Sequence, residues 1–143
     1  MTLPISVIGF FCEDIREEKS GGTTILGVMP DSANLPPLPP GTAAGTLQLV
    51  PKLCIYLRAS FDPQSPPTGV TCTLLLQDGT RQALAIFEDA LIARGAREAI
   101  EIGSPIAVVI GRVEMVPFKA LPGQVRVEVT VGDVTYIAAA INF

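Results

Sequence analysis

A strict alternation of valine with polar residues over residues 125–131 constrains the fold of this chain most. Every odd-numbered residue in that stretch is valine, and the residues between them are Arg126, Glu128 and Thr130. Successive side chains of a strand point to opposite faces of a sheet, so this pattern predicts a strand with one buried and one solvated face. Gly132 and Asp133 then predict a tight turn into a final strand over residues 134–142.

Other stretches with strand character follow one another at short intervals. Asp78-Gly79 is the strongest hairpin signal, because this pair suits a type I′ turn. The proline-rich residues 30–45 favour an extended loop that crosses between two sheets. Together the strands predict an all-β fold, an antiparallel β-sandwich of about eight strands with Greek-key, Ig-like or C2-like connections, in a single domain over 1–143. Besides 125–131 and 134–142, these strands are 5–16, 23–29, 46–61, 70–76, 81–87 and 106–117.

Residues 88–100 are the one segment with helical character. Acidic residues begin the segment and arginines follow, which matches the helix macrodipole. Ile92, Ala96 and Ile100 fall on one helical face. Gly95, in the middle, costs about 1 kcal/mol relative to alanine. We therefore predict one short helix near 88–100.

The absence of histidine narrows the chemistry that this chain can perform. The 143 residues contain no His. Ser-His-Asp and Cys-His nucleophilic sites and His-ligated metal sites are therefore excluded. No other nucleophile or metal motif stands out, so we expect a protein that is not an enzyme and holds no cofactor.

The acidic charge balance and the short apolar runs bear on partners and location. The formal net charge is −4, and basic residues are scattered singly, so we do not expect nucleic-acid binding. No apolar run approaches the roughly 18 residues of a spanning helix. The first run, residues 3–11, meets Glu13 and Asp14 at once, as a strand entering a charged turn does. We therefore expect a cytoplasmic protein without a membrane partner.

Three cysteines, Cys12, Cys54 and Cys72, lie in predicted strands. Their odd number, and the absence of a CxxC spacing, do not indicate a disulfide framework. We expect reduced, inert thiols that are buried as small hydrophobic side chains.

Two sets of acidic residues are candidates for chemistry. Glu13 and Asp14 are adjacent on a predicted strand, so they point to opposite faces and cannot form a carboxylate pair. Asp14 shares a face with Arg16, which favours an ion pair. The second set lies in turns, where calcium ligands and ordinary turn residues are both found. A small-ligand or calcium-binding sandwich is therefore the alternative function; its loop acids are Asp31, Asp62, Asp78, Asp89 and Asp133.

Surplus hydrophobicity is the more informative feature. Both faces of residues 106–110 are apolar, although a sandwich strand normally wets one face. Alternation with Arg112 and Glu114 directs Ala107 and Val109 to the core. Both faces of residues 136–141 are apolar as well, so the pattern there does not show which face points to the core. The outward side chains need cover, either from the 88–100 segment or from another subunit, and we favour the subunit. The predicted interaction surface is Ile106, Val108, Ile110 and Tyr136.

These observations predict a non-enzymatic binding or structural module. It would act by docking another protein or by self-association as a homo-oligomer. The chain has no histidine and no metal or phosphate motif, which argues against the commoner kinds of enzyme.

The opening residues 5–29 resemble the start of an uncharacterised bacterial β-sandwich family of unknown function. The shared pattern is FxCEDxRxExxG followed by a Gly-Val pair, and the chain departs from it where Gly21-Gly22 replaces a Gly-Lys turn. The resemblance implies a compact bacterial β-sandwich and no particular activity. The residues that carry it are Cys12, Glu13, Asp14, Arg16, Glu18, Gly21, Gly27 and Val28.

Overall fold

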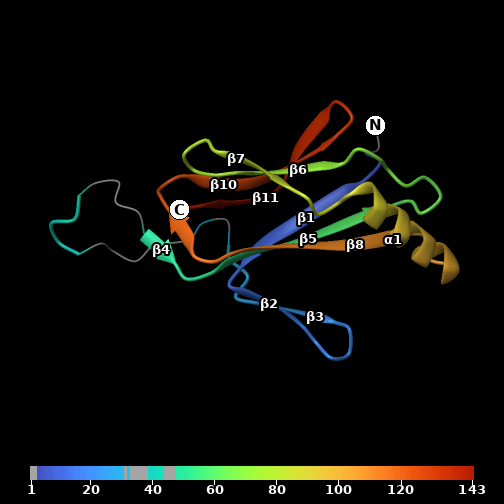
Figure 1. The fold of residues 1–143 in the computed structure, drawn as a ribbon, viewed down its shortest axis with the longest axis horizontal. Coiled ribbons are helices and arrows are strands. Elements are labelled where there is room, and N and C mark those ends of the chain that lie inside the picture. Colours follow the sequence, from blue (N-terminus) through green and yellow to red (C-terminus); the bar gives the residue numbers. More distant parts are fainter. Residues whose placement is uncertain (1–2, 31, 33–38, 44–47) are drawn as a thin grey trace.

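The structure is a computed structural model that describes residues 3–30, 32, 39–43 and 48–143. It confirms an all-β, sandwich-like fold with one helix among these residues. Figure 1 shows the two main layers, a three-stranded sheet ordered β1-β5-β8 and a four-stranded sheet ordered β11-β10-β6-β7. The elements are β1 Ser6–Cys12, β2 Asp14–Glu17, β3 Thr23–Leu26, β4 Gln48–Val50, β5 Leu53–Phe61, β6 Thr71–Leu75, β7 Arg81–Leu84, α1 Asp89–Glu101, β8 Ala107–Met115, β9 Phe118–Ala120, β10 Gln124–Val131 and β11 Val134–Asn142.

The core lies between the two sheets and follows the predicted alternation. The valines of β10 are buried, and the polar residues between them are half-buried. On β5 the odd-numbered residues 53–61 are buried against them. Burying a side chain of this size contributes about 1.5–3 kcal/mol, so these two strands carry much of the stability.

The number of strands differs from the prediction. The described residues form eleven strands instead of about eight. The predicted strand 5–16 divides after Cys12, because Glu13 turns the chain from β1 into the hairpin β2–β3. The predicted strand 46–61 divides at Pro51, which has no N–H to donate to a ladder. Most of the predicted crossover loop 30–45 lies outside the described residues, and the Greek-key connection stays a prediction.

The helix lies where the sequence predicts it, along the edge of β8 (Figure 1). Its buried residues are Ile92, Ala96 and Ala99. The prediction that Ile100 shares this face is wrong, because Ala99 completes the helical spacing and Ile100 is 48% exposed. Gly95 allows the close approach, since a Cβ there would lie 2.6 Å from Cγ2 of Val109.

A β-bulge in β11 changes which side of that strand faces the core. Val127 pairs with Ala139, but Glu128 pairs with Ile137, so one residue of β11 is left over. Tyr136 consequently turns inward and is half-buried, while Ile137 is exposed. The sequence-based placement of Tyr136 on an outward apolar face is therefore wrong. Its hydroxyl accepts from Val7 N at 3.1 Å and donates to Ile5 O at 3.2 Å, which joins β11 to the edge of β1.

Candidate functional site

The outer face of the three-stranded sheet carries a solvent-exposed apolar surface. The register aligns Ile8 of β1, Arg58 of β5 and Ile110 of β8 across the three strands. Ile8 is 51% exposed, Phe10 42%, Val108 40% and Ile110 41%. The next row across the face is Phe10, Tyr56 and Arg112. The two arginines aside, these side chains are largely apolar, and such a face is costly to leave in water.

Sequence reasoning found half of this surface. Ile106, Val108 and Ile110 point outward, and Ala107 and Val109 are buried, as the alternation of β8 predicts. Ile8 and Phe10 of β1 were missed, although they alternate with buried Val7 and Phe11 in the same way. Phe10 stacks on Tyr56 with ring centroids 6.4 Å apart, which extends the apolar surface across β5.

The outer face of the four-stranded sheet has the opposite character. There Glu128 lies 3.8 Å from Arg81 and 3.5 Å from Arg126 in an ion-pair network. Thr130 and Thr135 share a hydrogen bond of 2.8 Å across β10 and β11. This face is therefore largely polar, and Ile137 is its one large hydrophobic side chain that is exposed among the described residues, whereas the three-stranded sheet gathers several.

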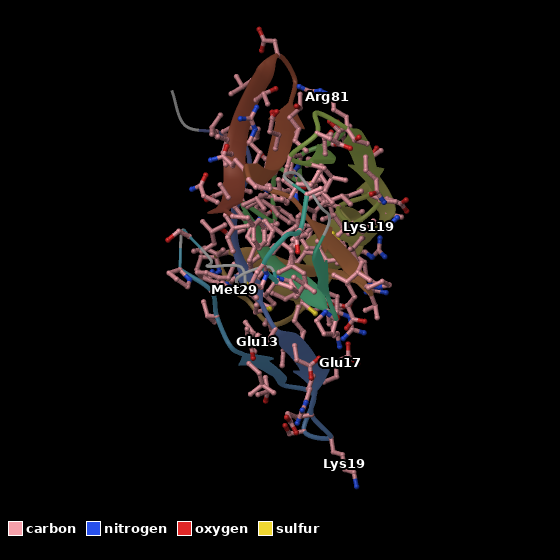
Figure 2. The ribbon with its side chains drawn as sticks, turned by 90° about the vertical axis from the view of Figure 1, so that its left-hand side faces the viewer. Glu13, Glu17, Lys19, Met29, Arg81 and Lys119 are labelled. Carbon is pink, nitrogen blue, oxygen red and sulfur yellow. The ribbon has the colours of Figure 1, made fainter. Side chains whose placement is uncertain are left out.

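The hairpin β2–β3 covers one end of the apolar face. It projects from the body of the protein with Lys19 at its tip (Figure 2). Ile15, Cys12 and Cys54 form a small buried cluster beneath it. Cys12 and Cys54 are directly opposite each other on β1 and β5. The prediction that all three cysteines are buried is confirmed.

Beside this cluster, one cation joins two carboxylates. Lys52 Nζ lies 2.6 Å from Asp14 Oδ1 and 3.7 Å from Glu114 Oε1. Arg16 Nε donates to Asp14 Oδ2 at 3.0 Å, which confirms the predicted ion pair. Hydrogen bonds from Lys52 and Arg16 lower the pKa of Asp14 to about 2.

Asp14, Cys54 and Glu114 are the group of potential metal ligands that the described residues bring together. Its two carboxylates are already paired with cations, Asp14 with Lys52 and Arg16, and Glu114 with Lys52. Burial raises the pKa of the Cys54 thiol, so the thiolate that a metal requires is disfavoured. Asp14 and Glu114 therefore form with Lys52 a salt bridge that fastens the hairpin to the start of β5 and to β8.

Three of the loop acids considered for calcium accept hydrogen bonds from backbone N–H groups. Asp62 accepts from Gln64 N, Asp78 from Thr80 N and Asp89 from Gly69 N, each at 2.9 Å. Asp31 lies outside the described residues. The bonds of Asp62 and Asp78 are ordinary turn chemistry, and Asp89 ties the start of the helix to the loop at Gly69, so these bonds do not favour the calcium alternative.

The residues of the opening motif have structural roles in the hairpin. Gly27 has a φ of 64°, and a Cβ there would lie 2.6 Å from the carboxyl carbon of Glu13. Glu18 Oε1 accepts from the Thr24 hydroxyl at 2.7 Å. Gly21, with a φ of 89°, forms the turn. The motif therefore builds the hairpin that covers Cys12.

A groove of about 500 Å³ lies where the hairpin, the helix and β8 meet. Its aliphatic lining includes Ile15, Leu91 and Val108. Its charges are paired with each other, Arg112 with Glu17 at 3.1 Å and Arg94 with Glu98 at 3.7 Å. The groove thus offers hydrocarbon and backbone rather than net charge.

Comparisons of the chain with family models, with curated proteins and with solved structures found no match. Within the described residues, no helix has the length and apolarity needed to cross a bilayer.

Proposed function

We propose that this protein is a non-enzymatic interaction module that docks another protein on the outer face of its three-stranded sheet. The observation that carries the proposal is the contrast between the two outer faces of one sandwich. The four-stranded sheet presents an ion-pair network, and the three-stranded sheet presents Ile8, Phe10, Val108 and Ile110. A partner that covers these side chains removes their hydrocarbon from water.

The charge of the face favours a different protein over a second copy. Arg58 lies in the central strand, between Ile8 and Ile110, and forms no ion pair among the described residues. Two copies that met face to face across a two-fold axis would bring two such guanidinium groups together. A partner with a carboxylate opposite Arg58 would gain an ion pair and bury the surrounding hydrocarbon.

The size of the face sets what the partner must do. Three strands at about 4.8 Å spacing and seven residues at about 3.3 Å give a projected area of roughly 330 Å². Stable interfaces bury about 800 Å² on each side. The partner must therefore also reach the helix, the hairpin or the groove between them.

The test compares matched positions on the two outer faces. A photoreactive phenylalanine analogue is placed at Phe10, and as a control at Thr73 of the four-stranded sheet, in cells that express the protein. We expect a specific adduct from the first position alone. The adduct is identified by mass spectrometry, and its affinity for the purified protein is then measured with the wild type and with Arg58→Glu.

Charge reversal at Arg58 should weaken binding at least tenfold, and a carboxylate-to-lysine change in the partner should restore it. Equal affinity for both proteins contradicts the proposal. Light scattering of the purified chain tests the remaining possibility, which is self-association through the same face. If the wild type is a dimer and Val108→Asp is a folded monomer, the face joins two copies and the proposal of a different partner is wrong.

A further inference from the structure

Hydrogen bonds at the edge of β1 reveal which backbone groups of the three-stranded sheet point outward. Phe11 O accepts from Met29 N at 2.7 Å, and Val7 N donates to the Tyr136 hydroxyl. The odd-numbered residues of β1 thus direct their N–H and C=O groups away from β5. In antiparallel sheets, directly paired residues either exchange both hydrogen bonds or none, alternately. The register pairs odd-numbered residues of β1 with odd-numbered residues of β5, and these with odd-numbered residues of β8. Because the bonding alternates, the backbone N–H and C=O groups of the even-numbered residues of β8 point away from β5, to the free edge of the sheet.

Two of these edge positions are already covered. Ile106 accepts from the Ser104 hydroxyl at 2.7 Å and donates back to it at 3.3 Å. The helix lies against Val108, whose carbonyl oxygen is 4.0 Å from where a Cβ on Gly95 would be. Ile110 and Arg112 make no hydrogen bond on this side with the described residues. Their edge opens into the groove between α1 and the hairpin.

We infer that this open edge of β8 binds an extended peptide segment of the partner protein by strand addition. The inference deepens the proposed function, on which it rests, by naming the form in which the partner reaches the groove. The backbone groups of Ile110 and Arg112 supply two donors and two acceptors in strand geometry. Aliphatic side chains of Ile15, Leu91 and Val108 line the site for alternate side chains of the segment.

The recessed position of this edge favours a peptide segment over a second copy of the chain. The edge lies between two walls, the helix and the hairpin, so β8 of another copy, itself recessed, cannot reach it. A single extended chain fits, and four residues of it span about 13 Å. Charges in the groove are paired internally, which favours an uncharged, aliphatic segment without proline.

Hydrogen exchange tests the edge with and without a probe peptide. The probe is acetyl-Lys-Val-Thr-Val-Thr-Val-Lys-amide, and its control is N-methylated at the three central residues, which blocks strand pairing. In the free protein the amides of Ile110 and Arg112 should exchange quickly, while those of Val109 and Gly111 are protected. The probe should slow exchange at Ile110 and Arg112. Fast exchange at Val109, or protection of Ile110 without peptide, overturns the inference.

Affinities for the probe complete the test. Ile110→Pro removes the outward N–H, and Ile110→Ala is its matched control because it retains that group. Proline and N-methylation should each lower affinity about fivefold to tenfold relative to their controls. Equal affinities, or no binding at millimolar probe, overturn the inference. The probe assays contain no partner protein, whereas the adduct at Phe10 requires one, so a failed edge site is distinguishable from a failed docking face.

Discussion

A pair of aspartate substitutions at neighbouring residues tests the orientation of β8 on which both proposals depend. Val108 is 40% exposed on the outer face, and Val109 is 6% exposed against the helix. Val109→Asp and Val108→Asp therefore introduce the same group on opposite faces of one strand. The chain contains no tryptophan, so far-UV circular dichroism in urea is the suitable assay.

The two substitutions should differ widely in their effect on the free energy of unfolding. Loss of the buried Val109 side chain costs about 1.5–3 kcal/mol. Full burial raises a carboxyl pKa by about three to five units, and the cost at pH 7 is then about 4 kcal/mol, because a carboxyl whose pKa is raised further takes up a proton. Their sum is comparable with the whole stability of a domain, about 5–15 kcal/mol, so Val109→Asp should be largely unfolded at pH 7. Val108→Asp should stay within about 1 kcal/mol of the wild type.

The pH dependence provides an internal control. The introduced carboxyl at position 109 has a folded pKa above its unfolded value, so its penalty is relieved progressively as pH falls from 7 toward about 4. Val109→Asn carries no charge and should be equally destabilised at pH 5 and pH 7. If Val108→Asp unfolds the protein as completely as Val109→Asp, the outer face is not exposed and the docking surface is refuted.

Three further predictions follow from individual contacts. The pKa of Asp14, about 2 against a usual 3.8, makes its stabilisation complete above about pH 4 and lost as pH falls toward 2; urea stabilities of the wild type and Asp14→Asn should converge at pH 2, and parallel curves refute this. Burial raises the pKa of Cys72 to about 11, so Ellman's reagent at pH 8 should label the three thiols slowly until urea is added; rapid native labelling contradicts burial. Tyr136→Phe leaves Val7 N–H without its partner and should cost about 1–2 kcal/mol by urea unfolding; Tyr56→Phe is the control, and equal losses would show that the hydroxyl bond is unimportant.

The fold class could be predicted because the alternation in β10 and β8 is a local property of each strand. Burial of every second residue leaves a period of two in the sequence, and the structure follows it in both strands. The helix was predictable from its charge order and apolar spacing. Its middle glycine was not explained, because the reason is a contact with Val109, a residue 14 positions later in the chain.

The errors arise where one residue breaks a period. Glu13 ends β1, and without knowing this the chain appears to continue as one strand to Arg16. The β11 bulge reverses the faces of Tyr136 and Ile137 relative to the residues after it. A shift of one residue moves a whole set of side chains to the other face, so no pattern on β11 alone could place Tyr136.

The two proposals for the three-stranded sheet are linked by the way in which the edges of that sheet are covered. Exposed strand edges invite pairing with other chains, and proteins usually block them. Here β1 is closed by Tyr136 and Met29, and β8 is closed at Ile106 by Ser104 and at Val108 by the helix. The stretch around Ile110 is left open, and its side chain also lies in the apolar outer face. An unblocked edge and an uncovered face that meet at the same residue are what a partner needs if it both pairs with β8 and packs on the sheet.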